Sequence, residues 1–188
     1  DTTVLIWDAS DLPPLPRQKL EAAEIEPHWR SLREPDARKA SDAHWKLAGS
    51  TETVLPFLKE RLRPVAKLPR GDVQPVLDQL EAREFRKRES AAKRLNDLGD
   101  GFAPLAQELL DGSPGEELRK RLAAFLESRR WSVPPTGDDL RLMRSVRLLE
   151  AIGTEESLKL VEKLAEGLPS ARATQEAVAA RERLRHWR

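Results

Sequence analysis

The sequence predicts an all-α fold, and three observations lead to this prediction. Charged residues make up 35% of the 188 residues and aromatic residues only 5%, a composition typical of amphipathic helices. Apolar residues recur at helical spacing through most of the chain after residue 16. Beyond residue 8, no two alternating apolar runs are joined by a short turn, as a β-hairpin requires. We therefore expect about ten helices.

The start of the chain differs from the rest. Residues 1–8 (DTTVLIWD) contain a short apolar run rich in β-branched residues, whose side chains would point to alternating faces, and this predicts one isolated strand. Residues 9–16 contain three prolines, which lack a backbone donor and fix φ, so this stretch is expected to be an extended linker.

Helical patterns begin at Arg17, and start and stop signals divide them into elements. Pro27 is expected to restart a short helix, and Asp36 to cap the next one. Ser113 is expected to be the N-cap of a later helix, with Pro114 at its first position. The expected helical segments are 17–25, 27–32, 36–48, 51–63, 72–80, 85–98, 102–111, 114–130, 137–152, 158–168 and 173–187.

A degenerate repeat is visible in the helical region. Gly49, Gly99 and Gly153 each follow a helical pattern and precede another, at separations of 50 and 54 residues. Helix pairs repeating every ~40–47 residues are typical of HEAT and armadillo proteins, which stack neighbouring pairs. The sequence therefore favours a HEAT/armadillo-like stack over 17–188, with a possible sub-boundary near 66–71. An irregular helical bundle remains the alternative.

The first eight residues also carry a family resemblance. They resemble the closing strand of a WD40 repeat, which ends in Trp-Asp after alternating apolar residues. Residues 27–65, 86–110 and 144–165 resemble the HEAT-like helical region that follows the propeller in bacterial WD40-repeat proteins of the planctomycete type. The resemblance implies that residues 1–8 are the last strand of a propeller blade. It brings no catalytic residues with it. Because the chain begins with Asp, we expect a piece of a longer protein.

The sequence offers no persuasive constellation for catalysis, a cofactor or a metal. Cysteine is absent, so disulfides and thiolate ligands are excluded. His28, His44 and His186 are each followed by Trp, but their spacing is not that of zinc ligands. We expect each Trp to pack in a helix interface with its His at the flank, which makes Trp29 and Trp45 structural residues. We expect no enzyme activity.

Charge leaves two hypotheses for function. The net charge of +1 gives no overall attraction to nucleic acid, and no apolar run is long enough to span a membrane. We expect a non-catalytic scaffold that binds other proteins or its own propeller, and cytoplasmic localisation is favoured. The alternative is a nucleic-acid-binding module using a basic helical face. The residues expected on that face are Arg86, Lys87, Arg88, Lys93, Arg94, Arg119 and Lys120.

Overall fold

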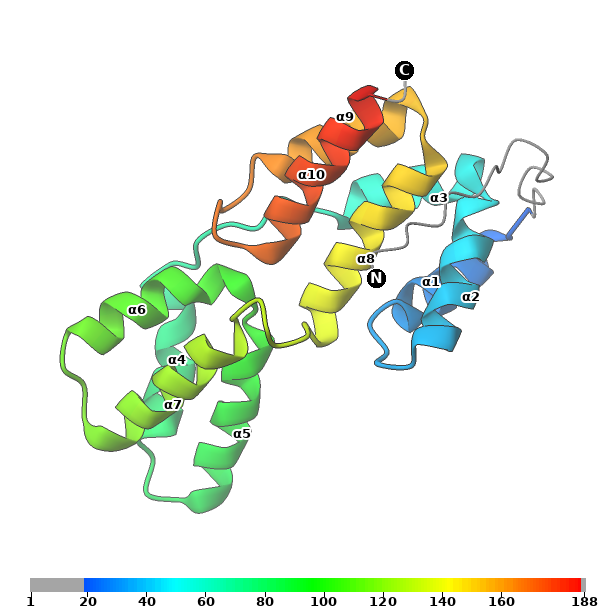
Figure 1. Ribbon diagram of the computed structural model, residues 1–188. Coiled ribbons are helices and arrows are strands. Elements are labelled where there is room, and N and C mark those ends of the chain that lie inside the picture. Colours follow the sequence, from blue (N-terminus) through cyan, green and yellow to red (C-terminus); the bar gives the residue numbers. More distant parts are fainter. Residues whose placement is uncertain (1–18, 187–188) are drawn as a thin grey trace, which may run out of the picture.

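The computed structural model describes residues 19–186, and this part of the chain is built from helices alone (Figure 1). The all-α prediction is confirmed. The expected strand at 1–8 and the expected linker at 9–16 lie outside the described residues. The elements in chain order are α1 (Ala22–Ser31), α2 (Ala37–Ala48), α3 (Thr51–Arg61), α4 (Arg70–Leu80), α5 (Phe85–Asp97), the 3-10 helix η1 (Asp100–Phe102), α6 (Ala103–Asp111), α7 (Glu116–Ser128), α8 (Gly137–Ile152), α9 (Glu155–Ala165) and α10 (Arg172–His186).

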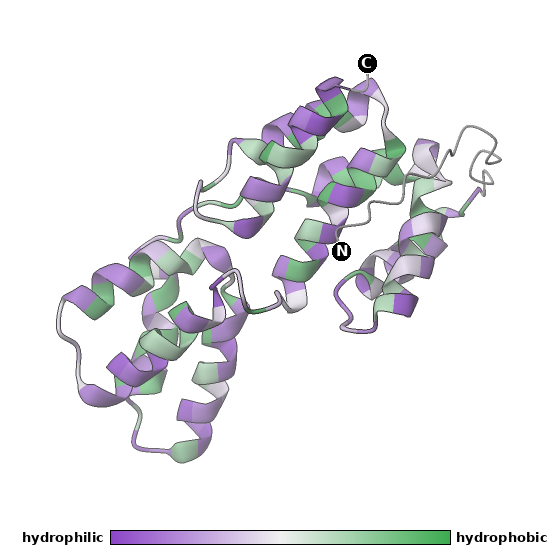
Figure 2. Ribbon diagram, viewed as in Figure 1, coloured by the Kyte–Doolittle hydropathy of each residue, from purple (hydrophilic) through white to green (hydrophobic). Residues whose placement is uncertain are grey.

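The helices form two bodies, each with its own apolar core. The terminal body consists of α1–α3 and α8–α10, and its core includes Leu47, Leu58 and Leu149, all fully buried. The middle body consists of α4–α7 with η1, and at its centre the rings of Phe102 and Phe125 meet edge to face at 5.0 Å. Each helix contains both apolar and polar residues (Figure 2), and its buried apolar residues form a stripe that faces one of these two cores.

The helices of the terminal body come from both ends of the chain. Helix α2 packs against α8 and α3 packs against α9, although the whole middle body separates them in sequence. A linear stack would instead place each helix pair against the next pair along the chain. The contacts therefore do not show the expected stack, because the apolar stripes of α2 and α3 are covered by distant helices rather than by the pair that follows.

The three glycines expected to end helices differ in backbone conformation. Gly153 ends α8 in the left-handed region, with φ of 65°. Gly99, between α5 and η1, has φ of 68°. Gly49 ends α2 with φ of −69°, a conformation that any residue adopts. Only the first two positions therefore require the conformational freedom of glycine.

Three expected helix starts can be compared with the structure, and the one at Pro27 is wrong, because α1 runs from Ala22 to Ser31 with Pro27 inside it. Asp36 caps α2 as predicted, since its Oδ1 accepts hydrogen bonds from the backbone N–H groups of Arg38 at 2.9 Å and Lys39 at 3.2 Å. The prediction of Ser113 as an N-cap is wrong. Helix α7 begins at Glu116 with Gly115 as its N-cap, and Ser113 has a φ of 57°. The turn before α7 thus takes up the residues that were expected to start the helix.

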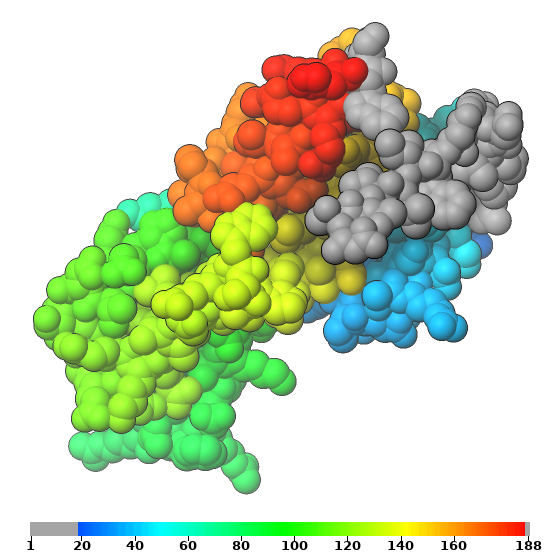
Figure 3. Space-filling model, viewed as in Figure 1, coloured from blue at the N-terminus to red at the C-terminus, as the bar shows by residue number. Residues whose placement is uncertain are grey.

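The two bodies meet at a buried network of charged side chains. Asp100 of η1 contacts Arg172 at the start of α10, and both residues are at least 95% buried. Arg129, just after α7, pairs with Asp139 near the start of α8 and lies 3.6 Å from Asp100. Burial raises the pKa of Asp139, and the neighbouring Asp100 carboxylate adds to this effect. In the space-filling view the green middle body abuts the yellow-to-red helices α8–α10 (Figure 3).

The connection from α3 to α4 is held by both bodies. The Leu68 N–H donates to the carbonyl of Gly101 in the middle body at 3.0 Å. The Leu168 N–H, in the terminal body, donates to the carbonyl of Val65 at 2.6 Å. The backbone of this connection is thus hydrogen-bonded on either side, and together with the charged network it fixes how the bodies are placed.

Candidate partner-binding groove

A continuous groove follows α4 on the surface of the middle body, and we refer to it as the α4 groove. Three adjoining hollows with volumes of about 360, 370 and 590 Å³ make up its length. The first and second hollows share the lining residues Arg70, Glu108 and Leu109. The second and third hollows share Glu81, Gly115 and Leu118. The walls therefore come from α4, the turn after it and the start of α5 on one side, and from α6 and the start of α7 on the other.

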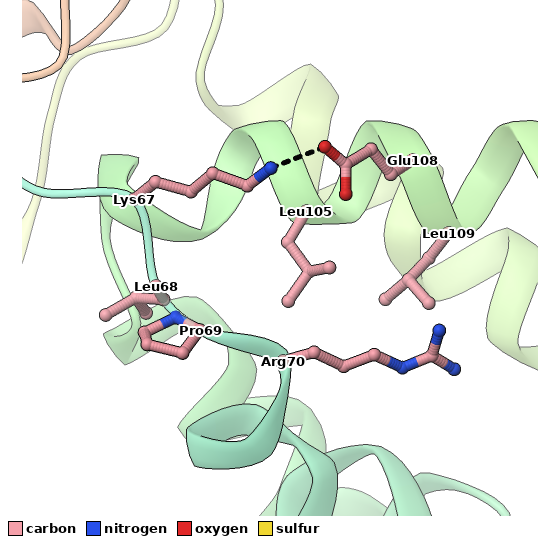
Figure 4. Close-up of a pocket in the computed structure, with 7 residues that line it drawn as sticks. All are labelled: Lys67, Leu68, Pro69, Arg70, Leu105, Glu108 and Leu109. Atoms are coloured by element: carbon pink, nitrogen blue, oxygen red, sulfur yellow. Dashed lines mark hydrogen bonds and ion pairs between the residues drawn. The ribbon is translucent and has the colours of Figure 1, made fainter.

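The first hollow lies where the chain enters α4 (Figure 4). Lys67, from the connection between the bodies, pairs with Glu108 of α6 at 2.5 Å and closes one edge. The side chains of Leu105 and Leu109 point from α6 towards Arg70, whose guanidinium extends beneath them (Figure 4). This end of the groove combines an apolar floor with a cation.

The third hollow contains an exposed aromatic ring. Phe85, the first residue of α5, is 66% exposed and lines this hollow beside Leu80 and Leu118. Phe85 begins the helical segment expected at 85–98, and no neighbouring helix covers its ring at the first turn of α5. The Arg88 guanidinium lies 5.8 Å from the centre of the Phe85 ring.

Arg88 is the one predicted basic residue that lines the groove, and its charge is already engaged by the backbone. Its Nη1 donates to the carbonyls of Ala82 at 2.9 Å and Arg83 at 2.8 Å. A guanidinium in this position satisfies carbonyls at the end of α4, so it stabilises the turn between α4 and α5. Arg88 therefore has a structural explanation.

The other predicted basic residues lie outside the groove on α5 and α7. Lys87 pairs with Glu84 at 2.7 Å, and Lys120 pairs with Glu116 at 2.6 Å. Arg94 donates to the side-chain oxygen of Gln79 at 3.3 Å. Within the described residues, four of the predicted cations form no ion pair and are exposed: Arg86, Lys93, Arg94 and Arg119. The expected basic face is thus partly neutralised by neighbouring carboxylates and divided between two helices.

The two predicted structural tryptophans differ in burial. Trp29 of α1 packs edge to face on Phe57 at 5.5 Å, and the Arg141 guanidinium lies 3.8 Å from the centre of its ring. Trp45 of α2 is 49% exposed. These contacts fit a structural role for Trp29, whereas Trp45 leaves half of its surface in solvent.

The burial of Trp45 and of the neighbouring His44 is the reverse of the expected burial. His44 is half-buried between α2 and α8, and burial, with the nearby Arg147, lowers its pKa. The interpretation that Trp packs inside and His lies at the flank is wrong for this pair. Both residues line a separate hollow of about 500 Å³ with Arg147, Glu176 and Arg183. The carboxylate of Glu176 pairs with both arginines, and that of Glu150 also pairs with Arg183, so this hollow presents matched charges.

The described residues do not bring metal-ligating side chains together. His28 lies on α1, His44 on α2 and His186 at the end of α10, where its Nδ1 lies 2.8 Å from the carbonyl of Glu182. In residues 19–186, no group of three or more His, Asp or Glu side chains could hold a metal ion. In the same part of the chain, every helix is too short or too polar to cross a membrane.

Sequence reasoning missed the features that define the groove. The exposure of Phe85 has a signal in the sequence, since it is the only apolar residue in the charged stretch 83–89 (REFRKRE). Such a position gives a ring few apolar neighbours on its own helix. Arg70 carries no comparable signal, because its place in the groove depends on how α4 and α6 lie together.

No protein family, curated protein or solved structure matches this chain. The functional argument therefore starts from the chemistry of the groove.

Proposed function

We propose that this chain is a non-catalytic protein-interaction module that binds a partner along the α4 groove. The observation that carries the proposal is the exposed Phe85 ring at one end of a continuous groove with leucines in its floor. Aromatic and arginine side chains dominate the binding energy of protein interfaces. An exposed apolar surface rimmed by polar groups is typical of a partner-binding site.

The fixed arrangement of the two bodies supports the same role. A buried ion network and backbone hydrogen bonds hold the middle body against the terminal body. A groove on a rigid frame loses little conformational entropy when a partner binds, so more of the contact energy contributes to affinity.

The resemblance of residues 1–8 to a WD40 closing strand supports a second part of the proposal. In this part, the helical chain follows a propeller, and the propeller is either the partner or the platform that orients the groove towards one. A HEAT-like origin of the helix pairs that flank Gly49, Gly99 and Gly153 belongs to the same proposal; these pairs are α2–α3, α5–α6 and α8–α9.

Nucleic-acid binding is the weaker proposal. A surface that follows a phosphate backbone needs cations without carboxylate partners, because these neutralise the phosphates and release the counterions bound to the nucleic acid. Lys87 and Lys120 each pair with a carboxylate, and Arg88 is bound to carbonyls. The groove itself includes Glu81, Glu108 and Glu117, which repel phosphates.

Site-specific photocrosslinking tests the proposal. A benzophenone amino acid replaces Phe85 in one variant and Val178, 38% exposed on α10 of the terminal body, in a control. Each variant is illuminated in nuclease-treated lysate of the source cells, and the adducts are identified by mass spectrometry.

We expect a defined protein adduct from the Phe85 position that is absent from the Val178 control. Equal adducts from both positions, or no protein adduct from the Phe85 position, would contradict the proposal. Adducts to nucleic acid in lysate without nuclease would favour the alternative.

A further inference from the structure

The hollow of about 500 Å³ beside Trp45, referred to here as the Trp45 hollow, presents an aromatic surface on the terminal body. Helices α2, α8 and α10 surround it, with His44 and Trp45 on α2 and Ala151 on α8. The His44 ring meets the Trp45 ring edge to face at 4.9 Å, so the two rings adjoin. Because Trp45 leaves 49% of its surface in solvent, this aromatic pair offers a large apolar area for a contact.

The charged side chains of the Trp45 hollow cancel one another. Arg147 pairs with Glu176 at 3.4 Å, and Arg183 pairs with Glu150 at 2.5 Å and with Glu176 at 3.1 Å. Burial and Arg147 lower the pKa of His44 below 6.5, so this imidazole adds no charge at pH 7. A surface with balanced charges does not select a charged ligand and suits a neutral one.

The described chain begins at the end of α2 that carries Trp45. The Leu20 N–H donates to Ser50 Oγ at 3.1 Å, and the same hydroxyl donates to the carbonyl of Lys46, the residue after Trp45, at 3.1 Å. The Thr53 hydroxyl donates to the Leu20 carbonyl at 3.4 Å. The segment that precedes Leu20 is therefore tethered close to the Trp45 hollow.

That segment is rich in proline and neutral at its centre. Residues 12–16 (LPPLP) lie outside the described residues and contain no charged side chain. They precede Leu20 by four to eight residues, which corresponds to about 12–25 Å at the rise of a polyproline helix. An α-helix is about 10–12 Å wide, so this length is sufficient to pass around α2 from Leu20 to the hollow.

Proline-rich segments and aromatic surfaces are complementary. A segment with several prolines is already restricted in φ, so it loses little conformational entropy when it docks in an aromatic-lined groove. A short tether also raises the local concentration of the segment to roughly the millimolar range, so that weak contacts are enough to hold it.

We propose that residues 12–16 dock in the same chain on the aromatic surface of Trp45 and His44, between α2, α8 and α10. This interface goes beyond the proposed function, because it lies on the terminal body and shares no residue with the α4 groove. Its consequence is directional. Docking gives residues 1–8 a fixed direction of departure from the helices.

Equilibrium disulfide formation in the full chain tests the inference, because the sequence contains no cysteine. Leu15→Cys is combined with Ala151→Cys, at an exposed position that lines the hollow, or with Lys46→Cys as the control. Lys46 is exposed on the same helix as Trp45 but does not line the hollow, and it lies at the tether. A segment that does not dock should therefore reach Lys46 at least as easily as Ala151.

The fraction of disulfide in a glutathione redox buffer gives an effective concentration for each pair of cysteines. A second series uses Leu12→Cys in place of Leu15→Cys, so that an unsuitable geometry at one position does not decide the result. We expect the effective concentration of the Ala151 pair to exceed that of the Lys46 pair by about tenfold in at least one series.

The aromatic contact is tested by Trp45→Ala, which should lower the effective concentration of the Ala151 pair about fivefold. Replacing Pro13, Pro14 and Pro16 by Ser should lower it as well, whereas both changes should leave the Lys46 pair nearly unchanged. Circular dichroism checks that the helices of Trp45→Ala are intact.

Equal effective concentrations at Ala151 and Lys46 in both series would overturn the inference, as would a value that Trp45→Ala leaves unchanged. Disulfide-linked dimers that increase with protein concentration would overturn it too, because they assign the hollow to a second copy of the chain. Photocrosslinking at Phe85 depends on none of these results, so the α4 groove is tested separately.

Discussion

Asp100 and Arg172 lie 72 residues apart in sequence and form a buried ion pair between the two bodies. The backbone N–H of Arg172 donates to Asp100 Oδ2 at 2.8 Å, and Arg172 Nη2 lies 3.4 Å from Asp100 Oδ1. Arg172 Nη1 also donates to the carbonyl of Val133 at 3.1 Å, in the segment that joins α7 to α8. Arg172 therefore links the middle body, the segment between α7 and α8, and helix α10.

Asp100→Ala should lower the free energy of unfolding by about 3 kcal/mol, because it leaves the buried, charged Arg172 with only the more distant Asp139 carboxylate, at 3.9 Å. Asp97→Ala, at an exposed position on α5, is the control and should change this free energy by less than about 0.5 kcal/mol. Urea denaturation followed by circular dichroism measures both variants. Similar values for the two would show that the pair contributes nothing to stability.

Gly99→Ala should be more destabilising than Gly153→Ala. Gly153 is in the left-handed helical region, where alanine costs about 1 kcal/mol of backbone energy. Gly99, with φ of 68° and ψ of −169°, is in a region essentially restricted to glycine, where the backbone cost is about 1–3 kcal/mol. A Cβ on Gly99 would lie 2.7 Å from Asp139 Oδ1, whereas a Cβ on Gly153 would have ordinary contact with the Glu150 carbonyl at 3.6 Å. We expect a total loss of roughly 2–3 kcal/mol for Gly99→Ala in thermal or urea denaturation. Equal losses would mean that Asp139 moves aside freely.

Trp29→Ala should cost more stability than Trp45→Ala. Trp29 loses its contacts with Phe57 and Arg141, and a change of this kind costs about 2–4 kcal/mol at a partly buried site. Trp45 is 49% exposed, so we expect less than about 1 kcal/mol for its removal. Chemical denaturation gives both values, and iodide quenching of the remaining Trp fluorescence checks the difference in exposure. The reverse order of stability would contradict these environments.

The stability of the protein should fall with decreasing pH in part through His44. Burial and Arg147 hold the pKa of His44 in the folded state below its ordinary value of 6.5. The unfolded chain therefore binds a proton more readily, and the free energy of unfolding falls as pH drops below 6.5.

The variant His44→Gln should show a smaller loss of stability below pH 6.5 in urea denaturation. His28, whose pKa is also lowered by burial and by Lys46, should account for part of what remains. An unchanged pH dependence in His44→Gln would show that His44 is equally easy to protonate in both states.

The all-α class and the cap at Asp36 could be predicted from the sequence because both follow from local patterns. Helical periodicity and a side chain that bonds N–H groups two or three residues later need no distant neighbour. The exposure of Phe85 and Trp45 could not be predicted in this way. Each belongs to a plausible apolar stripe, and only the placement of other helices leaves it uncovered.

The candidate site was less accessible to sequence reasoning than the fold. Clustering of charge along the chain singled out Arg88, which supports a turn, and not Arg70, which faces the groove. The groove exists because α4 and α6 lie beside each other with leucines between them, and that relationship is tertiary. A count of cations in the sequence also does not show which of them form ion pairs. Lys87 and Lys120 each pair with a glutamate in the structure, so neither is a free positive charge.

The assembly of the terminal body from both ends of the chain determines the order in which the protein can fold. Helices α4–α7 are contiguous, so their core closes through contacts that are short in sequence and quick to form. During synthesis α1–α3 leave the ribosome first, yet the α8 and α9 that cover them are made only after the whole middle body. Until translation passes α9, the core that α1–α3 form together therefore lacks the cover that α8 and α9 provide, and in this interval we expect α1–α3 to be most prone to aggregation.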